Sequence, residues 1–137
     1  MARVESRARA RALQALYAWD VRGEEGLERV AQNVWDDLGV GPEERKQAAR
    51  IVGEIVRSRR DVDAELAAVT TNWRLERLGT IERCVLRLAA AELRLADAPP
   101  KVVIQEAVRL AERYGSAQSA RFVNGIVDAL ARRLGRL

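Results

Sequence analysis

Apolar residues recur at helical spacing along almost the whole chain, and this periodicity constrains the fold more than any other feature. One stretch has them at Leu27, Val30, Ala31, Val34, Trp35 and Leu38. Steps of three and four residues place such side chains on one face of an α-helix, whereas a half-buried strand alternates apolar and polar residues. No segment shows a convincing alternation. The periodicity therefore predicts an all-α fold.

Length and composition limit this fold to one domain. The chain has 137 residues, of which 48% are hydrophobic, and this is enough for a single continuous core. The sequence contains no repeat and no low-complexity linker. We expect a compact bundle of about six or seven helices over residues 1–137.

Glycine, proline and polar clusters indicate where these helices begin and end. We expect the first helix over about residues 4–20, and Gly39 should end the second. Pro42 should open a third helix that is long or slightly broken, with an interruption at 70–72 and a short link over 73–79. Residues 97–100, which end in two prolines, are predicted to form a loop, and Ser119 is predicted to cap the last helix.

The residue inventory excludes most catalytic chemistry. The chain has no histidine, which rules out histidine-based triads, general bases and metal sites, and it has no glycine-rich phosphate loop. Cys84 stands alone in an apolar stretch, so we expect a buried, inert thiol. No apolar run is long enough to cross a bilayer, and no signal peptide is visible. We predict a cytoplasmic protein that is not an enzyme and needs no cofactor or metal.

Charge is distributed unevenly, although the net charge is only +4. The first eleven residues hold Arg3, Arg7, Arg9 and Arg11 against Glu5. Residues 20–44 hold eight acids against two arginines. This arrangement indicates two kinds of surface, one suited to phosphates and one to a cationic partner.

The basic start of the chain is the first candidate site. Arg3, Arg7 and Arg11 recur every four residues, and Gln14 continues the same strip. A basic strip on a helix can follow a phosphate backbone, and arginine also stacks on bases. The alternative is a solvated helix face, and the residues alone leave both interpretations open.

The second candidate site lies at residues 114–125. It combines the hydroxyl of Ser119 with Arg121, Phe122 and Asn124 near the start of a helix. Helix starts bind phosphates, and aromatic rings stack on unpaired bases. The alternative is a polar turn in which Phe122 belongs to the core, and the residues alone favour that reading.

Three blocks of the sequence resemble the NusB family of transcription antitermination factors. The first is Arg7-Ala8-Arg9 followed by 12–17, and the second is Ile81-Glu82-Arg83 with the residues up to Leu93. The most specific block runs from Pro100 to Val108 and ends in 119–125. The similarity extends over nearly the whole chain and is weakest between residues 21 and 50.

The resemblance implies a helical fold of two small subbundles that binds boxA-type single-stranded RNA. It also implies a partner, the ribosomal protein NusE, and a role with the transcription elongation complex in read-through of ribosomal RNA operons. The implied RNA-binding positions are Arg7, Arg9, Gln14, Tyr17, Ser119, Arg121, Phe122 and Asn124. Glu82 matches a position on the side of the protein partner.

The chain departs from the family pattern at its start, where the family often has two or three adjacent arginines. Here Glu5 and Ser6 precede Arg7, so Arg3 and Arg11 are expected to substitute from other angles on the helix. Two other functions stay open: the NusB-like domain of a ribosomal RNA cytosine methyltransferase, and a helical protein-interaction adaptor. No glycine-rich cofactor-binding domain follows within the 137 residues, which weighs against the methyltransferase. The oligomeric state is also open, including a homodimer that hides the RNA surface in the free protein.

Overall fold

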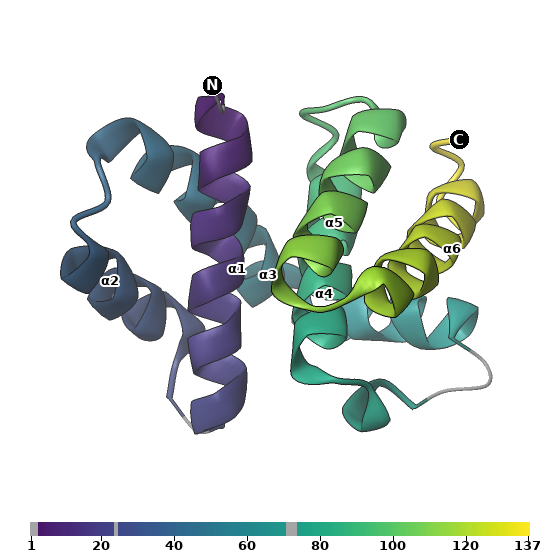
Figure 1. Ribbon diagram of the computed structural model, residues 1–137, viewed down its shortest axis with the longest axis horizontal. Helices are drawn as coiled ribbons and strands as arrows, with labels where there is room; N and C mark the ends of the chain where they lie inside the picture. The colour runs from purple at the N-terminus through teal and green to yellow at the C-terminus, as the bar shows by residue number, and fades with distance from the viewer. Residues whose placement is uncertain (1–2, 24, 71–73) are drawn as a thin grey trace.

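Six α-helices and one short 3-10 turn make up the part of the chain that the computed structural model describes, residues 3–23, 25–70 and 74–137 (Figure 1). They are α1 (Val4–Arg22), α2 (Leu27–Leu38), α3 (Pro42–Val69), η1 (Leu75–Arg77), α4 (Thr80–Leu95), α5 (Pro100–Tyr114) and α6 (Ala117–Arg133). These described ranges contain no strand. The prediction of an all-α bundle of six or seven helices is confirmed.

The helices form two groups that share one core. α1 packs against α2 and α3, while α5 packs against α4 and α6, and contacts of α1 and α3 with α4 join the two groups. Figure 1 shows α1, α2 and the start of α3 on one side of the molecule and α4–α6 on the other, while the later part of α3 continues below α4 and α6. α4 lies at the centre, because every residue from Cys84 to Leu93 is buried. A helix that is apolar on nearly all sides belongs in the interior of a bundle.

Most helix ends lie close to where the local sequence signals predicted them. Gly39 ends α2 in the left-handed conformation, with φ 64° and ψ 38°, and Pro42 is the first residue of α3. The capping role predicted for Ser119 is wrong, because α6 begins earlier, at Ala117. Ser116 is the cap, and its Oγ accepts the Ser119 backbone N–H at 3.1 Å.

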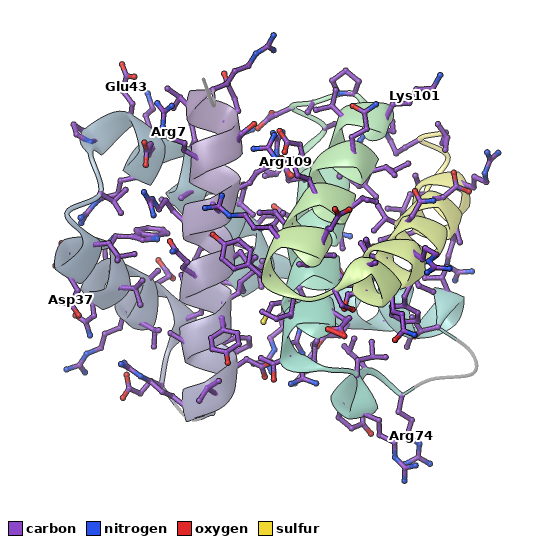
Figure 2. The ribbon with its side chains drawn as sticks, in the orientation of Figure 1. Arg7, Asp37, Glu43, Arg74, Lys101 and Arg109 are labelled. Carbon is purple, nitrogen blue, oxygen red and sulfur yellow. The ribbon has the colours of Figure 1, made fainter. Side chains whose placement is uncertain are left out.

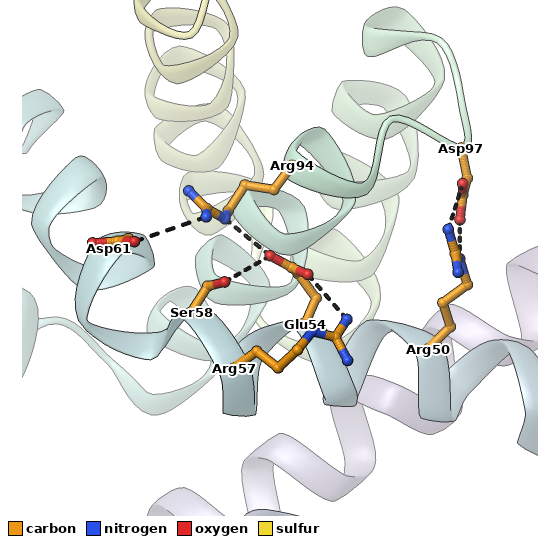
Figure 3. Close-up of polar contacts among 7 residues, drawn as sticks. All are labelled: Arg50, Glu54, Arg57, Ser58, Asp61, Arg94 and Asp97. Atoms are coloured by element: carbon orange, nitrogen blue, oxygen red, sulfur yellow. Dashed lines mark hydrogen bonds and ion pairs between the residues drawn. The ribbon is translucent and has the colours of Figure 1, made fainter.

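α3 is long and bent, as the sequence predicts. Ser58 leaves the helical conformation, with φ −121° and ψ 23°. Arg94 of α4 spans the bend, since its Nε donates to Glu54 at 3.1 Å while its Nη2 lies 3.9 Å from Asp61 (Figure 3). α3 ends at Val69, and η1 occupies part of the predicted link. Residues 71 and 72 of the predicted interruption and residue 73 of the predicted link lie outside the described residues.

Cys84 is fully buried in α4, which confirms the predicted burial. Burial and the neighbouring Asp20 raise the pKa of its thiol to about 12, so the reactive thiolate is strongly disfavoured. Within the described ranges, no helix combines the length and the apolar character that crossing a membrane requires.

Candidate nucleic-acid interface

The outward face of α1 carries the first group of predicted RNA-binding residues. Arg3, directly before the helix, is exposed, and Tyr17 keeps 44% of its surface exposed. Gln14 is half-buried, and its Oε1 accepts a hydrogen bond from Arg11 Nη1 at 3.1 Å. With 3.6 residues per turn, positions 3, 14 and 17 fall within a sector of about 60°. This face therefore presents a cation, an amide and an aromatic ring together.

Arg7 and Arg11 both reach the start of α3. Figure 2 shows Arg7 on the side of α1 away from α5. Both donate to Glu44 in the first turn of α3: Arg7 Nε to Oε1 at 2.6 Å, and Arg11 Nε to Oε2 at 3.3 Å. The hydrogen bond from Arg7, followed by that from Arg11, holds the pKa of Glu44 below its ordinary value against the effect of burial. The two side chains remain 38% and 31% exposed. A phosphate that approaches these arginines has to compete with Glu44.

Arg9 lies inside the protein, where α1 meets α4 and α5. Only 6% of its surface is exposed. Its Nε donates to both carboxylate oxygens of Glu92 at 2.8 Å, and its Nη1 donates to Glu106 at 3.3 Å. Burial raises the pKa of Glu92, although Arg9 opposes the rise. The predicted contact between Arg9 and RNA gains no support from this position, which is that of an internal cation joining three helices.

The second predicted group lies at the start of α6, next to the start of α4. Ser119 is buried, and its Oγ donates to Glu82 Oε1 at 3.3 Å. Phe122 is half-buried, whereas Arg121 and Asn124 are exposed. The serine thus has a structural partner, while the other three side chains reach the surface in whole or in part.

A cavity of about 280 Å³ opens between these two helix starts. It is lined by Arg77, Leu78, Gly79, Glu82, Ser116, Gln118, Ser119 and Phe122. The sequence assigned Glu82 to a protein partner and Ser119 and Phe122 to RNA, and the structure brings all three to one cavity. No residue in this lining comes from α1, so the first predicted group does not contribute to the cavity. A carboxylate, hydroxyls and a ring in one cavity suit a nucleobase edge or a polar protein side chain.

A model of the NusB family matches residues 6–132 of this sequence. The chain belongs to the NusB family. This confirms the resemblance seen in the sequence. A protein named transcription antitermination protein NusB, from Anaeromyxobacter dehalogenans strain 2CP-1, is 46% identical over 129 residues, covering 92% of this chain and 89% of that protein. A relative of the same name from Sorangium cellulosum is 41% identical over 96% of this chain and 94% of its own.

Solved NusB structures share the fold along nearly its whole length. T. maritima NusB matches with a TM-score of 0.88 and 32% identity, over 96% of this chain and 93% of that chain. A crystal structure of the antitermination factors NusB and NusE in complex with double-stranded RNA also matches with a TM-score of 0.88. Its identity is 30%, and the match covers 97% of this chain and 99% of that chain.

Arg83, which follows Glu82 in the NusB-like sequence, holds the wall of the cavity, a role that the sequence did not reveal. Its Nη2 lies 2.7 Å from Asp20 of α1, and its Nη1 donates to the carbonyl oxygens of Leu78 at 2.8 Å and Leu75 at 3.3 Å. It therefore ties the segment before α4 to α1. The only signal in the sequence was its place next to Glu82, because carbonyl partners depend on tertiary structure.

Proposed function

We propose that this protein is a transcription antitermination factor that binds boxA-type single-stranded RNA together with a NusE-type ribosomal protein. In this role it joins the transcription elongation complex and supports read-through of ribosomal RNA operons. The NusB-family match over residues 6–132 carries the proposal. Relatives matched over most of their length are named antitermination proteins, and one matching structure is described as NusB with NusE and double-stranded RNA.

The side chains on the two surfaces favour a single strand. Tyr17 on α1 and Phe122 on α6 offer rings, and only unpaired bases expose a face on which a ring can stack. Arg121 and Asn124 stand beside Phe122 and are exposed, so they can meet a phosphate and a base edge. Arg3 adds a further cation at the start of α1.

Negative charge supports a basic protein partner. Glu82 is half-buried at the cavity, where it offers a carboxylate to a cationic group. Exposed acids also line the other end of the molecule; Asp37 and Glu43 mark that side in Figure 2. Ribosomal proteins are basic, and complementary charge of this kind speeds and orients association.

Fluorescence anisotropy with labelled RNA tests the proposal. We expect tighter binding to a boxA-like single strand than to a scrambled strand or to the corresponding duplex, and further tightening with the NusE-type protein. About four phosphate contacts give a slope near −3 for log affinity against log salt on a single strand. Equal and weak binding to all three RNAs, unchanged by the partner, would contradict the proposal and favour a helical protein-interaction adaptor.

A pair of matched variants checks the site. Arg121→Glu reverses an exposed charge at the start of α6 and should weaken RNA binding at least tenfold. Arg133→Glu makes the same change on an exposed residue at the end of the same helix, about 18 Å away. It should leave binding within about twofold of wild type. Equal losses in the two variants would mean that only overall charge attracts the RNA.

A further inference from the structure

The contact between α1 and α5 creates a seam on the surface of the molecule. Glu106 of α5 accepts a hydrogen bond from the Ser6 hydroxyl of α1 and also receives Arg9 Nη1 at 3.3 Å. Figure 1 shows the two helices running side by side in the same direction. Ser6 lies one turn after Arg3, so the seam begins beside the exposed cation of the α1 surface.

Two arginines of α5 follow this seam. Arg109 and Arg113 come three and seven residues after Glu106, so at 3.6 residues per turn both project from the side of α5 that Glu106 presents to α1. Both are exposed, and Figure 2 shows Arg109 on the edge of α5 that faces α1. The Arg109 side chain is 59% exposed and lies 3.9 Å from Glu106, a distance that implies only a loose ion pair.

The surface of α5 at these arginines is hollowed. A hollow of about 410 Å³ is lined by Gln105, Val108, Arg109, Glu112 and Arg113. The guanidinium carbon of Arg113 lies 5.2 Å from the centre of the Tyr114 ring, which orients its planar donors. Glu112 is the one carboxylate in this lining, against two guanidinium groups and an amide. The balance of charge suits an anion.

This stretch of α5 leads from the seam with α1 toward the start of α6. Glu106 of α5 contacts Ser6 and Arg9 in the first half of α1, and α5 ends at Tyr114, two residues before the Ser116 cap of α6. The path from Gln105 to Arg113 measures about 12 Å along the helix. Its Arg113 end is three residues before Ser116, which lines the cavity together with Ser119 and Phe122. The two exposed arginines of this stretch offer a basic connection to a polyanion bound at both surfaces.

We propose that the RNA crosses from α1 to α6 over this face of α5, with Arg109 and Arg113 as contacts to its phosphates. The inference rests on the proposed function and adds to it a path for the RNA between the two predicted groups. Contact with the Tyr114 ring limits the conformations of the Arg113 guanidinium, whose planar donors suit phosphate oxygens.

A salt titration of the double variant Arg109→Gln/Arg113→Gln tests the path. Glutamine removes charge and keeps length and polarity, so the fold should be unaffected, which thermal unfolding checks. With about 0.7 of slope per phosphate contact on a single strand, we expect the salt dependence to become shallower by about 1.4 and affinity in low salt to fall about tenfold. Arg109→Lys/Arg113→Lys should retain most of the slope. The control Arg132→Gln/Arg133→Gln removes the same charge from exposed positions at the end of α6 and should change the slope little.

The outcomes separate this inference from the proposed function. If wild type binds boxA-like RNA with a steep salt slope and the α5 variant keeps that slope, the path over α5 is wrong and the proposed function stands. If wild type binds no RNA, both fail. If the α5 variant binds RNA normally but loses the NusE-type protein, this face binds protein and the path is also wrong. A short RNA that reaches only the cavity at α6 should be insensitive to the α5 variant, and sensitivity equal to that of the long RNA would contradict a connecting path.

Discussion

The arginines of α1 and those of α5 are the same residue type in two different electrostatic situations. Arg7 and Arg11 share Glu44, and Arg9 is enclosed by Glu92 and Glu106. On α5, Arg109 has only a loose contact with Glu106, and Arg113 lies over the ring of Tyr114. The helix with the more conspicuous cluster of arginines therefore offers less of its positive charge to a ligand.

Carboxylates on neighbouring helices determine whether an arginine joins helices or stays available to a ligand. A guanidinium held by internal carboxylates joins helices and contributes to stability, and removing it leaves a buried negative charge. A guanidinium on an open face remains available to phosphates and contributes little to stability. Matched variants of the two helices should therefore differ in their effects on the free energy of unfolding and on RNA binding.

The largest effect should come from Arg9→Ala. This change leaves the buried carboxylate of Glu92 without its two hydrogen bonds, and the free energy of unfolding should fall by about 3–5 kcal/mol. The matched change Arg109→Ala should alter it by no more than about 0.5 kcal/mol, because that side chain is exposed. Urea unfolding followed by circular dichroism measures both. Similar small losses in the two variants would erase the distinction between the helices.

Arg83→Ala should have the next largest effect. Arg83 resembles Arg9 in being held inside the protein, since it binds Asp20 and two carbonyl oxygens before α4. Loss of these bonds should cost about 1–3 kcal/mol in the free energy of unfolding. It should also weaken the binding of any ligand that uses the cavity at Glu82, because the cavity wall would no longer be tied to α1. Unchanged stability would show that the segment before α4 is held by packing alone.

The helices were predictable from the sequence because their signals are local. Gly39 and Pro42 act through the backbone of their own neighbourhood, and α2 buries most of the periodic face that the sequence showed, with Leu38 at its end exposed. The start of α6 was misplaced because Ser116 and Ser119 can both cap a helix. In the structure Ser116 is the cap, and Gly115 directly before it allows a tight turn, since a Cβ there would lie 2.7 Å from the Ala111 carbonyl oxygen.

The environment of the site residues was not predictable, because it depends on residues distant in sequence. Glu92 is 83 positions from Arg9, so nothing near Arg9 indicates that it is buried. Glu82 is 37 positions from Ser119, and only the packing of α4 beside α6 brings the two to one cavity. The sequence predicted no role for Arg113, because a single arginine on an amphipathic helix resembles any other solvated charge until its neighbours in space are known.

Glu44→Gln should make the arginines of α1 behave more like those of α5. The amide cannot hold Arg7 and Arg11 as the carboxylate does, so their positive charge becomes more available to phosphates. We expect RNA affinity to rise several-fold and the salt slope to become steeper by up to about 1.4. Glu43→Gln, a neighbouring exposed acid, is the control and should have a much smaller effect. Equal effects of the two changes would mean that net charge alone is responsible.

The smallest expected effect is on the titration of Glu44 and Glu92, the two carboxylates that bind arginines of α1. Their pKa values should depart from the ordinary value of 4.5 in opposite directions. Hydrogen bonds from Arg7 and Arg11 lower the pKa of Glu44, so its contribution to stability is present above pH 4.5 and is lost as the pH falls through the lowered pKa. Burial raises the pKa of Glu92, so its contribution is greatest below pH 4.5 and is lost as the pH rises through the raised pKa. Carboxyl carbon shifts in an NMR titration should give a midpoint below 4.5 for Glu44 and above it for Glu92. If both midpoints fell below 4.5, the hydrogen bonds from Arg9 would outweigh the effect of burial on Glu92. The buried pair of Arg9 and Glu92 would then behave like the partly exposed pairs of Glu44.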